Sequence, residues 1–306
     1  MIELRGIYPI LATPFQASGD LDKQGLERLV DFLIASGVPG VTLFGLAGEY
    51  YKLAEYERAY VEKVFLTRTE GVFARIVSIS DHSTELAQRR AEEAADAGSD
   101  ALLIMPPFFL SPDTNAVCDH IRAIAGTVRI PILVQHAPNL TGMRLSAAVF
   151  AGLAEEFPHV QYVKVDSTPA GPMISELLAE SGGRVKPIVG YAGLQMMDAL
   201  TRGAVGCMPG CSLPEPYQES YAKFTQGDRQ GAAVSHARFL PLINYMMQSL
   251  EFIIQCEKTI LHWRGIIDSD YCRRPNARLT THDLRALREL CKSSVPMLCR
   301  EWGRIQ

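Results

Sequence analysis

One lysine stands in the middle of an otherwise apolar segment, VQYVKVDST at residues 160–168. Of the lysines in the chain, only Lys164 lies between apolar residues inside a strand-like run. Burying an ammonium group is costly unless it is paired or loses its proton, and a neutral lysine amine attacks ketones to form a Schiff base. Two interpretations follow. Lys164 forms an imine with an oxo substrate, or it pairs with Asp166, which lies two residues on and on the same strand face.

A second chemical signal is the segment GLAGE at residues 45–49, which follows another apolar run. Small residues in a turn that leads into a helix leave backbone N–H groups free to receive a carboxylate. The alternative is an ordinary tight turn in which Glu49 starts the helix. The spacing of two glycines alone does not decide between these readings.

Eight short apolar runs punctuate the first two thirds of the chain and predict the strands that position these residues. They cover residues 6–15, 40–45, 73–80, 101–107, 130–136, 160–166, 186–190 and 204–210. Amphipathic stretches such as LDKQGLERLVDFLIASG lie between them and end in glycine, as helices do. Nearly continuous apolar strands are typical of parallel sheets covered on both faces.

Eight strand–helix units in series predict a (β/α)₈ TIM barrel, with active-site residues where strands end and loops begin. An open doubly wound sheet is the alternative, but no GxGxxG or GxxxxGK[ST] motif follows any run. Further helices are expected near 214–226, 229–249, 253–267 and 282–293. We therefore expect a barrel domain at 1–227 and a C-terminal helical extension at 228–306. In that extension we expect Glu257 and Lys258 to form a solvated or interface pair.

Composition limits the function classes. A net charge of −4 over 306 residues gives no basic surface for nucleic acid or an anionic membrane. No apolar run is long enough to span a bilayer and the N-terminal segment has no cleavage-type leader, so we expect a cytoplasmic protein. The seven cysteines form no CxxC pair and the histidines show no metal-ligand spacing, so we expect neither a disulfide framework nor a metal site.

The order of these motifs resembles the dihydrodipicolinate synthase / N-acetylneuraminate lyase family of Schiff-base-forming barrels. The resemblance covers nearly the whole chain and rests on four segments, namely GLAGE after the second run, PPFF after the fourth, QHAPNLTG after the fifth and the lone lysine in the sixth. It implies that Lys164 condenses with a 2-oxo acid without a cofactor. It also implies that the Gly45–Gly48 turn, including Leu46 and Ala47, binds the substrate carboxylate.

The departures from the family pattern narrow the activity. Gln135 stands where the family keeps a proton-shuttling tyrosine, and Leu46 and Ala47 replace two threonines. Phe109 replaces a second tyrosine, and Leu140 replaces the synthase arginine. None of these replacements can move a proton or bind an anion. Dihydrodipicolinate synthase activity itself is therefore not expected.

An imine at Lys164 still acidifies the neighbouring carbon, and the resulting enamine can expel a 4-hydroxyl as water. Together with LPLINY at 240–245, the QHAP segment resembles the family branch that dehydrates 2-keto-3-deoxy sugar acids such as L-2-keto-3-deoxyarabonate. A pyruvate-releasing aldolase and a non-catalytic 2-oxo-acid-binding barrel are the alternatives. The resemblance also implies a homo-oligomer, a tetramer or a dimer. Besides Lys164 and Gln135 as catalytic residues, we expect the pocket to be shaped by Phe109, Gly190, Tyr191, Met208 and Gly210.

Overall fold

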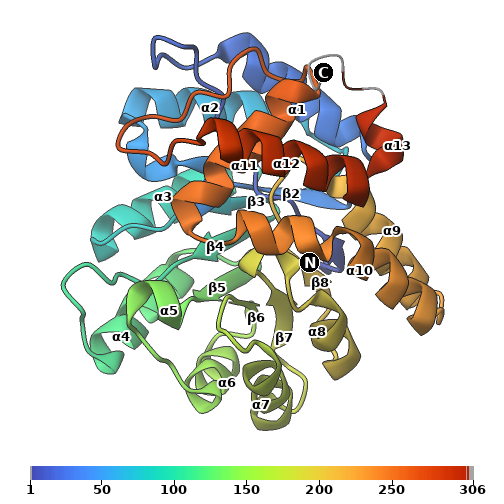
Figure 1. Ribbon diagram of the computed structural model, residues 1–306. Helices are drawn as coiled ribbons and strands as arrows, with labels where there is room; N and C mark the ends of the chain where they lie inside the picture. The colour runs from blue at the N-terminus through green and yellow to red at the C-terminus, as the bar shows by residue number, and fades with distance from the viewer. Residues whose placement is uncertain (1, 301, 303–306) are drawn as a thin grey trace. The chain divides into compact units, whose positions relative to one another are not determined.

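The computed structural model describes residues 2–300 and residue 302, and it has the predicted (β/α)₈ barrel fold (Figure 1). Its strands follow the order β1-β8-β7-β6-β5-β4-β3-β2, with helices between consecutive strands along the chain. The strands are β1 (Gly6–Ile7), β2 (Gly40–Leu43), β3 (Ala74–Ser78), β4 (Ala101–Ile104), β5 (Ile132–His136), β6 (Val160–Val165), β7 (Lys186–Val189) and β8 (Gly206–Cys207).

Each strand lies within its predicted run, and the first is much shorter than predicted. Pro9 and Pro14 have no N–H to donate, so the segment after Ile7 cannot continue a regular ladder. It makes isolated parallel bridges instead, from Ile10 to Thr42 and to Gly210. Regular pairing therefore ends at Ile7, although the chain stays buried as far as Phe15.

The chain divides into two compact units, which are described separately. The first comprises the chain up to Tyr8 together with Ala74–Met208, and it holds β1 and β3–β8, paired in parallel. Its helices are α3 (Thr84–Asp96), α4 (Thr114–Thr127), α5 (Pro138–Thr141), α6 (Ala147–Glu156), α7 (Gly171–Ser181) and α8 (Met196–Arg202). Helix α3 packs beside α4, and α7 packs beside both α6 and α8 (Figure 1).

Local sequence signals set the ends of these helices. The side chains of Ser83 and Asp113 cap the first turns of α3 and α4 by accepting backbone N–H groups. Gly182 ends α7 in the left-handed conformation that glycine adopts at little cost. The strands between the helices are lined by fully buried aliphatic side chains, and Lys164 is one of the fewer buried polar residues of this unit.

The second unit comprises Pro9–Phe73 and the chain from Pro209 onward. It holds β2, α1 (Lys23–Ala35), α2 (Glu55–Arg68), α9 (Pro214–Thr225), α10 (Arg229–Met246), α11 (Leu250–Trp263), α12 (Thr281–Ser294) and α13 (Pro296–Cys299). Helix α10 packs against α9 and α12, and α12 starts with a reciprocal cap between Thr280 and Asp283. The four predicted C-terminal helices correspond to α9–α12. The expected domain division at residue 227 stays a prediction. In the described part of the chain, no helix combines the length and apolarity that crossing a bilayer requires.

Candidate active site

Lys164 lies in β6 and is buried, with 7% of its surface exposed. Strand alternation places Val163 and Val165 on one face of β6 and Lys164 with Asp166 on the other. The register aligns Lys164 with Gln135 on β5 and with Ile188 on β7. The lysine is thus fixed on both sides by the sheet, with its amine near the end of the strand.

Three donors converge on the carboxylate of Asp166. The Lys164 ammonium forms an ion pair with Oδ2, and Gln135 Nε2 donates to the same oxygen at 2.7 Å. The backbone N–H of Tyr191 donates to Oδ1, also at 2.7 Å. Because only the NH₂ group of an amide can donate to a carboxylate, the orientation of Gln135 is fixed and its Oε1 remains as the acceptor. The pairing with Asp166 that the sequence left open is therefore present.

The turn after β7 leaves space for the Asp166 carboxylate and donates a hydrogen bond to it. A Cβ atom at Gly190 would lie 1.8 Å from Asp166 Oδ1 and 3.1 Å from Lys164 Nζ, so only glycine fits. Tyr191 and Ala192 follow with φ of 52° and 51°, a left-handed conformation that non-glycine residues rarely adopt. Such residues each carry about 1–3 kcal/mol of strain, which persists where surrounding contacts enforce it. Here the strained turn directs the Tyr191 N–H at Asp166.

The other polar groups near Lys164 are not placed to exchange protons. His136 takes the opposite face of β5, where its ring meets Phe150 edge-on at 5.6 Å, and burial lowers its pKa to about 4. Cys207 on β8 is fully buried, and burial raises the pKa of its thiol. Met208 is also buried and donates its backbone N–H to Val189. The contact of the Lys164 amine with a titratable side chain is thus its ion pair with Asp166.

In the second unit, residues 45–49 form the predicted turn. Gly45 packs so tightly against Ile10 that a Cβ atom would lie 2.6 Å from its side chain. Leu46–Gly48 form a single 3₁₀ turn in which Gly48 and Glu49 donate backbone N–H groups to Gly45 and Leu46. The N–H groups of Leu46 and Ala47 take no part in these two hydrogen bonds. They are the groups expected from the sequence to bind a substrate carboxylate.

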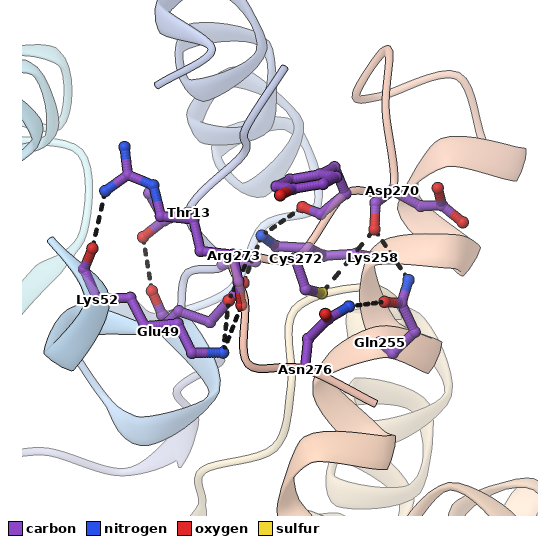
Figure 2. Close-up of polar contacts among 12 residues, drawn as sticks. Thr13, Glu49, Lys52, Gln255, Lys258, Asp270, Cys272, Arg273 and Asn276 are labelled. Atoms are coloured by element: carbon purple, nitrogen blue, oxygen red, sulfur yellow. Dashed lines mark hydrogen bonds and ion pairs between the residues drawn. The ribbon is translucent and has the colours of Figure 1, made fainter. Parts of the chain in front are cut away.

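Glu49 anchors this turn through ion pairs and a hydrogen bond (Figure 2). It is fully buried and left-handed at φ 54°, and its Oε1 lies 2.5 Å from Lys258 Nζ. Its Oε2 receives Lys52 Nζ at 3.2 Å and the Arg273 N–H at 3.1 Å. Thr13 adds a 2.6 Å hydrogen bond to the Gly48 carbonyl. A buried carboxylate thus ties the turn to α11 and to the segment after it.

The expectation for Glu257 and Lys258 is wrong. Both are buried, and Lys258 is 0% exposed, because α11 has neighbours on several sides from Ile253 to Leu261. They also serve different partners. Lys258 pairs with Glu49, whereas Glu257 accepts the Ser212 N–H at 2.8 Å, and burial raises the pKa of the Glu257 carboxyl.

The remaining predicted site residues lie in two places. Gly210 belongs to the second unit, where a Cβ atom would meet the Glu257 carboxylate at 2.2 Å. Phe109 lies in the loop after β4, is 78% exposed, and has its ring 6.1 Å from that of His82. The structure therefore groups Lys164, Gln135, Gly190 and Tyr191 around Asp166, whereas the ring contact of Phe109 is with His82. Tyr191 contributes through its backbone, which the sequence did not reveal.

Comparison of the sequence with known proteins finds relatives along nearly the whole chain. The profile described as "Dihydrodipicolinate synthetase family" matches residues 3–294. The chain is 27% identical to an L-2-keto-3-deoxyarabonate dehydratase from Azospirillum brasilense over 301 residues, which cover 97% of this chain and 96% of the relative. It is 31% identical to a 4-hydroxy-tetrahydrodipicolinate synthase from Salinibacter ruber over 78% of each chain.

Comparison with solved structures finds similar proteins. A crystal structure described as a putative dihydrodipicolinate synthetase from Pseudomonas aeruginosa superposes with a TM-score of 0.90 at 26% identity. The match covers 95% of this chain and 99% of that one. The resemblance inferred from the sequence motifs is confirmed.

Proposed function

Because the chain belongs to the dihydrodipicolinate synthetase family, whose members are lyases, we propose that it dehydrates a 2-keto-3-deoxy sugar acid through an imine at Lys164. L-2-keto-3-deoxyarabonate is the proposed representative substrate. The observation that carries the proposal is a buried lysine whose amine contacts a carboxylate and lies beside a glutamine. The dehydratase relative, which matches nearly the full length of the chain, supports the same reaction.

The first step is condensation of the Lys164 amine with the 2-oxo group of the substrate. The imine withdraws electrons from C2, so a proton on C3 becomes acidic and an enamine forms. Expulsion of the 4-hydroxyl as water then gives an unsaturated imine, which hydrolysis releases from the lysine. No metal or organic cofactor is needed for this sequence. Among the described residues, no group of three or more potential ligands is placed to hold a metal.

Gln135 favours elimination over carbon–carbon cleavage. Retro-aldol cleavage begins by removing the proton of the 4-hydroxyl, and an amide cannot accept that proton usefully. Elimination instead needs that hydroxyl to be held and protonated as it leaves. The Gln135 amide donates to Asp166, so its Oε1 can orient a substrate hydroxyl by accepting its hydrogen. We assign Gln135 this orienting role.

We also propose that the 45–48 turn binds a substrate carboxylate through the N–H groups of Leu46 and Ala47. The support comes from the turn itself, because its internal hydrogen bonds use the N–H groups of Gly48 and Glu49 instead. A homo-oligomer, a dimer or a tetramer, is part of the same proposal, since family members often assemble in this way. Phe109, exposed in the isolated chain, is proposed to contribute to the pocket in that assembly.

Product analysis tests the reaction type. The protein is incubated with L-2-keto-3-deoxyarabonate, and the mixture is followed by NMR and mass spectrometry. Loss of one water with the carbon chain intact supports the dehydratase. Release of pyruvate with a two-carbon aldehyde identifies an aldolase instead. Binding without turnover identifies the non-catalytic alternative, in which the barrel only holds a 2-oxo acid.

A further inference from the structure

The mechanism above leaves one position unfilled, the group that moves protons in place of the missing tyrosine. We propose that Asp166 is this catalytic residue, acting as the general base and acid at the Lys164 imine. The inference rests on the proposed imine chemistry and names a residue beyond it. Asp166 qualifies because its carboxylate contacts the reacting nitrogen itself.

The neighbouring groups cannot take this role. Gln135 does not titrate, and Cys207 is a buried thiol whose pKa is raised, so it holds its proton. His136 faces away and packs on Phe150. This leaves Asp166, the one carboxylate that contacts Lys164 Nζ in the described part of the chain.

The residues around Asp166 fix the position of its carboxylate. Gln135 and the Tyr191 N–H each fix one carboxylate oxygen at 2.7 Å. Gly190 lacks the Cβ atom that would lie 1.8 Å from Asp166 Oδ1, and two left-handed residues follow it. Strained backbone of this kind clusters at active sites, where it helps to hold a group in the alignment that a reaction needs.

The proton balance closes with one carboxylate. Asp166 takes a proton from the Lys164 ammonium, and the freed amine attacks C2 while one of its two remaining protons passes to the former carbonyl oxygen, which gives the carbinolamine. The protonated Asp166 returns that proton to the carbinolamine hydroxyl, which leaves as water while the C=N bond forms. The carboxylate then takes a proton from C3, whose C–H electrons form the C2=C3 bond as the C=N electrons move to nitrogen. Finally, protonated Asp166 gives this proton to the 4-hydroxyl, which departs as water as C3=C4 forms.

Because C3 is two bonds from the imine nitrogen, a carboxylate in contact with that nitrogen lies close to the C3 proton. No oxidant or second reactant is required. Asp166 makes its four transfers with the lysine and the substrate because it alternates between its two protonation states. This accounts for elimination in a site that lacks the family tyrosine.

The test separates imine formation from C3 deprotonation. Wild type, Asp166→Asn and Lys164→Met are incubated with pyruvate in D₂O. Borohydride reduction with mass spectrometry measures the adduct, and NMR measures exchange of the pyruvate methyl protons. Asp198→Asn is the matched control, because Asp198 forms an exposed i,i+4 pair with Arg202.

We expect wild type and the Asp198 variant to form the adduct and to exchange the methyl protons. We expect Asp166→Asn to form the adduct more slowly and to exchange the methyl protons at least about 100-fold more slowly, the usual effect of losing a general base. Lys164→Met should do neither. Exchange by folded Asp166→Asn at the wild-type rate overturns the proposal. Absence of an adduct in wild type overturns the imine chemistry itself, a different failure.

Discussion

Replacing Lys258 by methionine tests whether the buried ion pair holds the 45–49 turn in place. The substitution keeps an unbranched side chain of similar length, so little cavity is created. It removes the 2.5 Å contact with Glu49 Oε1, a 3.1 Å hydrogen bond to the Tyr271 carbonyl and a cation–π contact with Phe15 at 4.2 Å. Glu49 is fully buried, so its charge has no access to water.

Losing one partner of a buried pair costs about 3–5 kcal/mol, because the other charge stays buried. Here the lower end applies, since Lys52 and the Arg273 N–H still contact Oε2. We therefore expect Lys258→Met to lower the free energy of unfolding by about 3 kcal/mol. Combining it with Glu49→Gln removes the stranded charge, so the double variant should lose less than the sum of the single variants by about 1–2 kcal/mol.

Urea unfolding followed by circular dichroism measures these differences. Lys292→Met is the matched control, because Lys292 is half exposed and lies 3.7 Å from Glu289, and it should change stability by no more than about 0.5 kcal/mol. If Lys258→Met behaves like this control, or if the two single losses simply add, the pair does not hold the turn and our reading of Figure 2 is wrong.

Three further outcomes are expected. Gly190→Ala should lower kcat by at least about 100-fold, because its Cβ displaces the Asp166 carboxylate; wild-type turnover would contradict the assigned geometry. For His136, the folded pKa near 4 lies below the ordinary 6.5, so the unfolded chain binds the extra proton between these values. Stability should fall by roughly 3 kcal/mol as pH drops through that window, and His136→Gln should lack this component in urea titrations. All seven cysteines are buried with raised pKa values, so a thiol reagent at pH 8 should label them only after denaturation.

The sequence singled out Lys164 and named Asp166 as a possible partner because a strand has a simple geometry. Residues two apart share a face, so the pairing was one of the two interpretations left open, and the structure contains it. The barrel followed from the alternation of apolar runs and helical stretches. Only β1 and β8 are much shorter than their predicted runs, and in β1 prolines interrupt the pairing.

Other features depend on contacts that no local pattern reveals. The donor role of the Tyr191 backbone needs a left-handed turn after a glycine, and nothing in the residue types at 190–192 requires it. Lys258 has polar and apolar neighbours, as a solvated helix position does, and its burial arises from packing against distant segments. Asp166 was identified as a partner, but its role as the shared acceptor of three donors required the structure.

Locating the covalent adduct tests the central claim most directly. The chain has two buried lysines in charged pairs, Lys164 and Lys258, so each serves as an internal control for the other. The protein is incubated with L-2-keto-3-deoxyarabonate, reduced with borohydride and digested, and the modified peptide is identified by mass spectrometry. We predict modification at Lys164 alone. Modification at another lysine, or none with either this substrate or pyruvate, would contradict the account and leave Lys164 as one half of a structural ion pair.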